Sequence, residues 1–163
     1  MNRETKEKYN RTATFYNRRY RKIQETKYSI MIDFPVEGKV LDIGCGTGLL
    51  YDFLGYEDYT GLDISLEMLK KGKFAGKILA NCETLPLKSE IFEYVFSFTV
   101  LQNLRSYKMI HEAYRVLKKG GIFVLTTLKK RYTGEVHEAL KPFEILDKRI
   151  CGEDIGFILK KPF

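Results

Sequence analysis

The chain has 163 residues, of which 44% are hydrophobic and 30% are charged. This balance is ordinary for a folded globular protein, and it excludes a disordered tail, a collagen-like repeat and a coiled coil. No apolar run approaches the roughly 18 residues of a membrane span, and the first residues lack the apolar stretch of a signal peptide. We therefore expect a single domain over residues 1–163 that is cytoplasmic and has no membrane partner.

The net charge of +7 is concentrated at the two ends of the chain. Residues 1–28 hold nine Lys or Arg against three Glu (+6), and residues 118–163 hold ten basic against six acidic residues (+4). Residues 29–117 hold nine against twelve (−3). A basic end favours an anionic partner, with nucleic acid the first candidate because each neutralised phosphate releases counterions. A solvated lysine-rich surface is the alternative.

The three cysteines, Cys45, Cys82 and Cys151, are scattered and form no C-x-x-C pair. An odd number of cysteines at such spacing argues against a disulfide framework and against a structural zinc site. No metal site is therefore expected.

Residues 5–28 are predicted to form an amphipathic helix within a basic N-terminal segment, residues 1–34. Apolar residues recur every three or four positions on one face, at Tyr9, Ala13, Tyr16, Tyr20 and Ile23. Five basic residues lie largely off this stripe and should face solvent: Arg11, Arg18, Arg19, Arg21 and Lys22.

After Pro35 the chain alternates between strand and helix patterns. Strands are predicted at 39–44, 59–64, 77–82, 93–99 and 121–128. Helices are predicted at 47–54, at 65–71 with Ser65 as N-cap, at 106–118 with Gly120–Gly121 as C-cap, and at 133–140. The last strands, 143–150 and 155–161, are linked too tightly for a crossover and predict an antiparallel hairpin. The fold class is α/β, a three-layer αβα sandwich with a mostly parallel sheet.

The most informative segment is VLDIGCGTG, residues 40–48, where a strand enters a glycine-rich turn that opens a helix. Asp63 follows Gly44 by nineteen residues, the offset at which a carboxylate can accept hydrogen bonds from ribose hydroxyls. Leu49 stands where a dinucleotide fingerprint has its last glycine, and the lysine of a phosphate-binding P-loop is absent. Asp42 just before the turn suits a cationic ligand group such as an ammonium or a sulfonium.

These residues carry a family resemblance. DIGCGTG followed by LDIS resembles the first two motifs of the class I (Rossmann-like) S-adenosylmethionine (SAM) methyltransferases, of the small single-domain type found in the Methyltransf_11 and UbiE-like group. The segments NCETLP (81–86), FEYVFS (92–97) and EAYRVLKKGG (112–121) resemble later motifs of that family. Residues 9–17 resemble its helix that closes over the cofactor. Asn81 departs from the family's acidic residue at the adenine, and asparagines stand at both acidic positions of 9–17.

The resemblance implies a seven-stranded sheet of order 3-2-1-4-5-7-6 and SAM as cofactor, with S-adenosylhomocysteine (SAH) as product. Asp42 would face the ammonium group and Asp63 the ribose. Asn81 and Cys82 would lie at the adenine edge, and Ser97 and Phe98 beneath the methionine, although Met68 and Phe98 could equally be core. The implied cofactor-binding residues are Tyr9, Tyr16, Asp42, Gly44, Cys45, Gly46, Asp63, Ile64, Met68, Asn81, Cys82, Ser97 and Phe98.

The methyl acceptor is less well marked. No catalytic constellation is visible; His111 and His137 are expected at the surface, and the cysteines are badly placed for carbon methylation. Four residues are candidates near the acceptor on position alone: Tyr16, Thr99, Gln102 and Asn103. The expected acceptor is an N or O atom of RNA, because the basic N-terminal helix would border an acceptor side without a large lid. The alternatives are a small molecule or protein side chain, or a SAM-binding subunit that needs a partner; an activating protein or a homodimer would fit.

Overall fold

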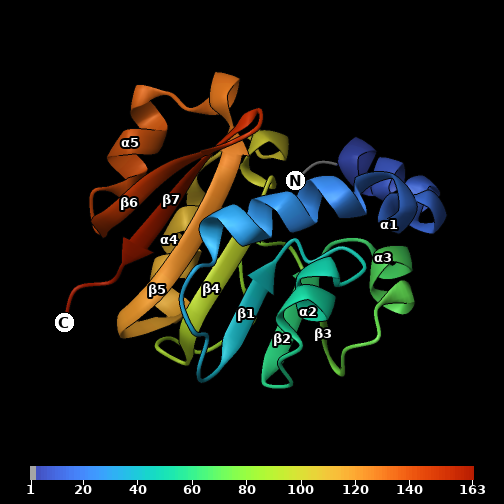
Figure 1. Cartoon of the computed structure of the whole chain (residues 1–163), viewed down its shortest axis with the longest axis horizontal. Coiled ribbons are helices and arrows are strands. Elements are labelled where there is room, and N and C mark those ends of the chain that lie inside the picture. The colour runs from blue at the N-terminus through green and yellow to red at the C-terminus, as the bar shows by residue number, and fades with distance from the viewer. Residues whose placement is uncertain (1–2) are drawn as a thin grey trace.

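The structure is a computed structural model that describes residues 3–163, except for the side chains of residues 3, 6 and 9–19. Its centre is a seven-stranded sheet in the order β3-β2-β1-β4-β5-β7-β6, shown in Figure 1. The strands are β1 (Val40–Ile43), β2 (Tyr59–Asp63), β3 (Gly76–Leu79), β4 (Phe92–Phe98), β5 (Leu117–Leu128), β6 (Glu144–Cys151) and β7 (Asp154–Lys160).

Strands β1 to β5 are parallel, and β7 is inserted antiparallel between β5 and β6. The predicted fold class, strand order and C-terminal hairpin are confirmed. Strand β1 has β2 on one side and β4 on the other. The strand order therefore reverses at β1: β2 and β3 extend the sheet to one side, and β4 and β5 extend it to the other. In open α/β sheets, ligands bind at the carboxyl ends of strands that meet at such a point.

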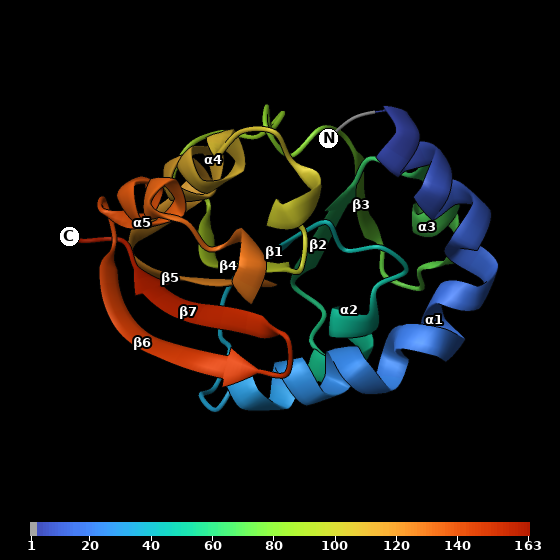
Figure 2. The same cartoon turned by 90° about the horizontal axis from the view of Figure 1, so that it is seen from above.

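Helices cover both faces of the sheet (Figure 2). On one face, α1 (Arg3–Met31), α2 (Leu49–Leu54) and α3 (Leu66–Lys71) enclose a core that includes Val40, Phe96 and Val124. On the other, α4 (Lys108–Val116) and α5 (Gly134–Leu140) pack over Leu41, Val95 and Leu125. Two short 3-10 turns complete the chain, η1 (Leu101–Asn103) and η2 (Lys129–Arg131). The alternation of faces along β1, β4 and β5 therefore builds two cores from one apolar run per strand.

The prediction that Gly120–Gly121 caps the helix after β4 is wrong. Helix α4 ends at Val116, and the next residue, Leu117, is already extended and pairs with Phe92 of β4. Gly120 lies inside β5 at φ +76°, where the pairing of β4 with β5 slips from Phe92–Leu117 to Tyr94–Ile122. The glycine pair therefore allows an irregularity in the strand, because a left-handed residue there costs glycine no steric strain.

Two other boundaries differ for local reasons. Helix α2 begins at Leu49 rather than at residue 47, because Gly48 holds the left-handed conformation at φ +85°. Strand β3 ends at Leu79, since the side-chain oxygen of Asn81 accepts from the Glu83 amide at 2.9 Å and starts a turn. Ser65 caps α3 as predicted and accepts a hydrogen bond from the Met68 amide.

The buried face of α1 differs from the predicted stripe in the part of the helix whose side chains are described. Ile23 is 54% exposed, whereas Gln24, Lys27, Tyr28 and Met31 are buried against the sheet and α2. The helix runs from the β6–β7 hairpin past α2 to α3 (Figure 2). Among the described residues, no helix is both long and apolar enough to cross a membrane.

Candidate functional site

The glycine-rich turn between β1 and α2 is tied to the end of β2. The amides of Gly44 and Cys45 both donate to the carbonyl of Leu62, at 2.7 and 3.0 Å. Gly44 has φ +75°, and a Cβ there would lie 2.3 Å from Cγ2 of Val100. The protein's own Val100 therefore fills the space beside Gly44 that a side chain would occupy. The turn is therefore held rigidly in place by contacts within the protein.

Asp63 connects this turn to the start of α3. Its carboxylate is 7% exposed and accepts from the Gly46 amide at 2.9 Å and from the Ser65 amide at 2.8 Å. Burial raises the pKa of Asp63, and the hydrogen bonds from Ser65, Gly46 and Ile64 oppose that rise. An ionised carboxylate has about four lone-pair sites, so these three hydrogen bonds leave Asp63 with acceptor capacity for a ribose hydroxyl.

Asp42 lies within β1, behind the turn, on the face that α2 and α3 cover. It is 4% exposed and accepts from the Tyr59 hydroxyl of β2 at 2.6 Å. Burial raises the pKa of Asp42 to about 7, with a smaller contribution from the charge of Asp63, while the Tyr59 hydrogen bond lowers it. A cationic group nearby would stabilise the ionised form, as expected for an ammonium partner.

The other predicted cofactor residues lie in α1, in α3 and near the carboxyl ends of β2, β3 and β4. Met68 and Phe98 are buried, and Phe98 makes an edge contact with Tyr28 of α1, as a core residue would. Ser97 is fully buried, and its hydroxyl has no hydrogen-bond partner among the described residues. Ile64 is half-buried. The side chains of Tyr9 and Tyr16 lie outside the described residues, so their predicted contacts stay predictions.

The loop after β3 carries the two residues predicted at the adenine edge. Asn81 is exposed, and its side-chain oxygen already accepts one backbone hydrogen bond, from Glu83. Cys82 is buried, which raises the pKa of its thiol to about 12, so it is protonated at neutral pH. All three cysteines are free and buried. Among the described residues, no group of three His, Cys, Asp or Glu could hold a metal ion.

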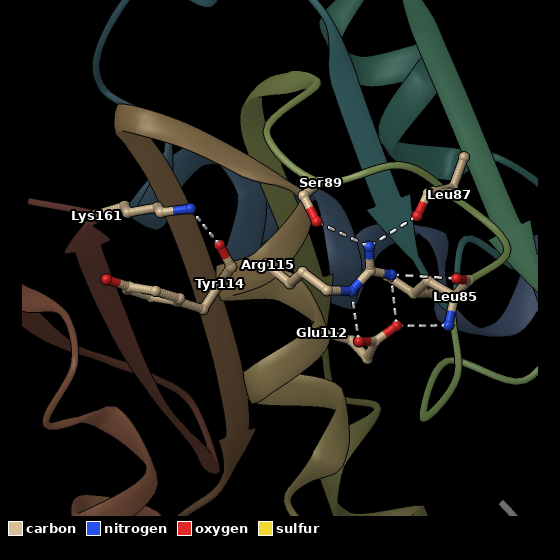
Figure 3. Close-up of polar contacts among 7 residues, drawn as sticks. All are labelled: Leu85, Leu87, Ser89, Glu112, Tyr114, Arg115 and Lys161. Carbon is tan, nitrogen blue, oxygen red and sulfur yellow. Dashed lines mark hydrogen bonds and ion pairs between the residues drawn. The ribbon is translucent and has the colours of Figure 1, made fainter. Parts of the chain in front are cut away.

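A clasp from α4 holds the continuation of that loop (Figure 3). Glu112 accepts from the Leu85 amide at 2.7 Å, and Arg115 donates to the carbonyls of Leu85 and Leu87 at 3.2 and 2.8 Å. Two further bonds of 2.8 Å join the Arg115 guanidinium to the Glu112 carboxylate, and they lower the pKa of Glu112. In the sequence, EAYR (112–115) only resembled a family segment. The structure shows that its Glu112 and Arg115 hold residues 85–89 in place.

Three of the four predicted acceptor candidates, Thr99, Gln102 and Asn103, lie directly after β4, and the side chain of the fourth, Tyr16, lies outside the described residues. The Thr99 hydroxyl contacts Lys27 of α1 and Asp154 of β7, and Gln102 donates to the Thr99 carbonyl. Sequence reasoning missed Lys27 and Asp154, because nothing local marks them as neighbours of residue 99. His111 and His137 are both exposed, as predicted.

Residues 41–125 match a family model described as "Methyltransferase domain". The chain belongs to this methyltransferase family. The match spans the turn, Asp63, the loop after β3 and the Glu112–Arg115 clasp, and the family implies SAM as methyl donor.

Two curated relatives illustrate the similarity in sequence. The uncharacterized protein MJ1252 of Methanocaldococcus jannaschii is 36% identical over 132 residues, covering 74% of this chain and 50% of that protein. A malonyl-[acyl-carrier protein] O-methyltransferase of Hamiltonella defensa is 34% identical over 107 residues, covering 61% of this chain and 42% of that protein. The chain spans about half the length of the curated relatives it matches.

Solved structures show the same fold at low identity. A SAM-dependent methyltransferase of Thermotoga maritima, described as a possible histamine N-methyltransferase, superposes with TM-score 0.76 at 20% identity, covering 94% of this chain and 97% of that one. A complex between the Haloferax volcanii Trm112 methyltransferase activator and a methyltransferase gives TM-score 0.73 at 16% identity, covering 95% and 98%.

Proposed function

We propose that this methyltransferase domain transfers a methyl group from SAM to a nucleophilic nitrogen or oxygen atom. The observation that carries the proposal is Asp63, a buried carboxylate that ties the Gly46 amide to the start of α3 and keeps acceptor capacity for a further hydrogen bond. When bound, SAM supplies an activated methyl group and leaves as SAH. The chain's own residues have the task of binding and orienting the two molecules, which is the main contribution such a transfer needs.

The residues present suit that cofactor. The Ser97 hydroxyl, which has no hydrogen-bond partner in the described part of the chain, is a buried polar group at the end of β4, next to the turn. A methionine group bound there would supply the partner that Ser97 lacks. Asp42, with its raised pKa, would lose its proton when an ammonium group binds. We assign no general base, since one is needed only where the acceptor must lose a proton early.

For the acceptor we propose RNA, on the strength of the charge in residues 1–28, nine Lys or Arg against three Glu. Lys22 is exposed, as a phosphate contact requires. Arg21 is instead engaged with Asp52 of α2 at 3.1 Å and with Glu25 at 3.3 Å, so it is partly neutralised. The side chains of Arg11, Arg18 and Arg19 lie outside the described residues.

The salt dependence of RNA binding tests this proposal. For single strands, the log–log slope of affinity against salt is about −0.7 per phosphate contact. Replacing Arg18, Arg19 and Lys22 by Gln should make that slope shallower by two to three contacts while SAH affinity stays unchanged. Gln preserves the helix because its helix propensity is close to that of Arg and Lys.

A matched control removes the same number of positive charges from a different part of the chain. Lys39, Lys88 and Lys119 are exposed and lie at the amino ends of β1, β4 and β5. Their triple Gln variant should keep the wild-type slope. A slope equally reduced in both triple variants, or unchanged in the first, would count against contact through α1.

A small-molecule or protein-borne acceptor is the second candidate, and the relatives favour it. One relative is named for a malonyl group on acyl-carrier protein, and one structural neighbour for possible action on histamine. A third possibility is that a partner completes the acceptor site, since another neighbour was solved with an activator protein.

One parallel experiment separates these readings. The chain is incubated with methyl-labelled SAM and with total RNA, total protein or a metabolite extract, each with and without added cell extract as a source of partner. The Asp63→Ala variant serves as the negative control. Label in RNA supports the first candidate, label in the other pools supports the second, and label only after adding extract supports the partner. SAH binding without transfer to any pool would refute the enzymatic proposal.

A further inference from the structure

A buried polar triad connects three distant parts of the chain beside the end of β4. The Lys27 ammonium of α1 donates to the Thr99 hydroxyl at 2.7 Å, and that hydroxyl donates to the Asp154 carboxylate at 2.7 Å. Lys27 and the same Asp154 oxygen, Oδ2, are 3.1 Å apart. Asp154 is 1% exposed and Lys27 is 8% exposed, so both charges are removed from bulk water.

Thr99 is held in an unfavourable backbone conformation. Its φ is +58°, a region that β-branched residues avoid at a cost of about 1–2 kcal/mol. Contacts on every side maintain it: the Thr99 amide donates to the carbonyl and hydroxyl oxygens of Thr126, both at 3.1 Å, and its carbonyl accepts from Gln102. Strain of this kind persists where the surroundings over-determine it, and it concentrates at functional sites.

The triad leaves hydrogen-bonding capacity unused. Asp154 Oδ1 is buried and has no hydrogen-bond partner among the described residues. The same is true of the side-chain oxygens of Gln102, which binds Thr99, and of Gln24, one turn before Lys27 on the buried face of α1. Leaving such an atom unpaired costs about 1–3 kcal/mol. All three atoms are oxygens that accept hydrogen bonds, so a group that satisfies any one of them must present an N–H or O–H.

The charges around the triad further restrict the chemical class of the ligand. Lys27 neutralises one oxygen of Asp154, and the remaining free groups are a carboxylate oxygen and two amide oxygens. An anionic ligand has no N–H or O–H for these oxygens, and the Lys27 ammonium is already engaged with Thr99 and Asp154, whereas an amine or alcohol would satisfy them. Thr99 directly follows Phe98 in the sequence. The family resemblance implies that Phe98 lies by the methionine part of the cofactor.

We propose that Lys27, Thr99 and Asp154 form the acceptor-binding site, in which Asp154 Oδ1 accepts a hydrogen bond from an amine or hydroxyl group of the molecule to be methylated. This rests on the proposed function and deepens it, because it names amines and alcohols, not carboxylates, as the acceptor class. Lys27 and Thr99 are positioning residues that hold the Asp154 carboxylate in place.

Ethanolamine is the probe, because it carries both donor types, and acetate is the carboxylate counterpart. Each is titrated into the SAH-saturated protein while the backbone amide signals of Thr99, Gln102 and Asp154 are followed by NMR. Ethanolamine should shift them saturably, and acetate should not. Shifts by acetate alone, or by neither compound, would overturn the proposal.

Two variants locate the effect. Asp154→Asn should weaken ethanolamine binding about tenfold, as expected when a hydrogen bond to a charged group is lost. Asp147→Asn, the same change at an exposed position of β6, is the matched control and should bind as wild type. Because Asp154→Asn also leaves Lys27 without its charge partner, Gln24→Met provides a second test. It removes an unpaired buried oxygen, so it should fold and still weaken binding; wild-type affinity in both variants would refute the site.

Failure of the inference and failure of the proposed function are distinguishable. SAH binding is measured first by calorimetry. If SAH does not bind, the proposed SAM chemistry is refuted. The inference can still be tested in that case, because ethanolamine can be titrated into the protein without SAH. If label transfer is observed, mild alkali adds a chemical readout. A methyl ester on a carboxylate would release its label as methanol and contradict the proposal, whereas N-methyl and O-methyl ether products would retain it.

Discussion

Replacing Asp42 by Asn should change how the stability of this protein depends on pH. Asp42 has a pKa of about 7 in the folded chain and 3.8 when unperturbed, because burial penalises its charge. Between these values the folded protein holds a proton that the unfolded chain has released, so the free energy of unfolding falls as pH rises. The stabilisation is complete below pH 3.8 and is lost as the pH rises through about 7.

The size of the effect follows from the two pKa values. Each pKa unit corresponds to 1.36 kcal/mol, so wild type should lose about 2.5 kcal/mol through Asp42 between pH 5 and pH 7.5. Asn is neutral throughout and keeps a carbonyl oxygen for the Tyr59 hydroxyl. The Asp42→Asn variant should therefore gain about that amount relative to wild type over the same interval.

Urea denaturation at pH 5, 6, 7 and 7.5 measures this difference, with Asp58→Asn at an exposed position as the control for the chemical change. A difference between Asp42→Asn and wild type that does not vary with pH would refute the reasoning. It would mean that the pKa of Asp42 in the folded protein is close to its unperturbed value of 3.8. In the wild type, SAM affinity should also rise as the pH passes 7, because the ionised Asp42 is the form that attracts an ammonium group.

Three further outcomes are expected. Asp63→Ala should weaken SAH binding tenfold to a hundredfold in calorimetry and also lower the stability of the free protein, by about 1–3 kcal/mol, because two buried amides lose their acceptor; unchanged affinity would remove Asp63 from the site. Gly44→Ala adds a Cβ 2.3 Å from Val100 at positive φ and should cost more in urea denaturation than Gly55→Ala, which has positive φ but nothing within 4 Å; equal losses would show that strain alone matters. Arg115→Gln should speed hydrogen exchange in residues 85–89 while exchange in β1 stays slow, and unchanged exchange would contradict the clasp.

Much of the fold and part of the site follow from patterns that are local in sequence. Apolar runs bounded by turn residues locate all seven strands, and the spacing of Gly44 and Asp63 brings those two residues to adjacent strand ends, since successive parallel strands of a βαβ unit finish at one edge. Ser65 is recognisable as a cap from its own side chain and its place before a helix. Each of these features depends on neighbours a few residues away or on one crossover.

The two glycines at 120–121 show where local patterns fail. A glycine after an amphipathic helix indicates a cap, yet here Leu117 is drawn into pairing with Phe92 of β4 before the helix reaches them. The competition between one more helical turn and a strand pairing is decided by a partner that lies far away in the sequence. Only the assembled sheet supplies that partner.

The contacts of Thr99 depended almost wholly on tertiary structure. Periodicity favoured Ile23 as buried and gave Lys27 no assignment, but Ile23 is exposed and Lys27 is buried. A lysine can be buried where an opposite charge compensates its lost hydration. For Lys27 that charge is Asp154, the first residue of β7. The sequence by itself determined the sheet, the turn and the carboxylate beside it, because these follow from backbone and burial preferences over short distances. Which charges meet beside Thr99 was decided only when α1, β4 and β7 packed together.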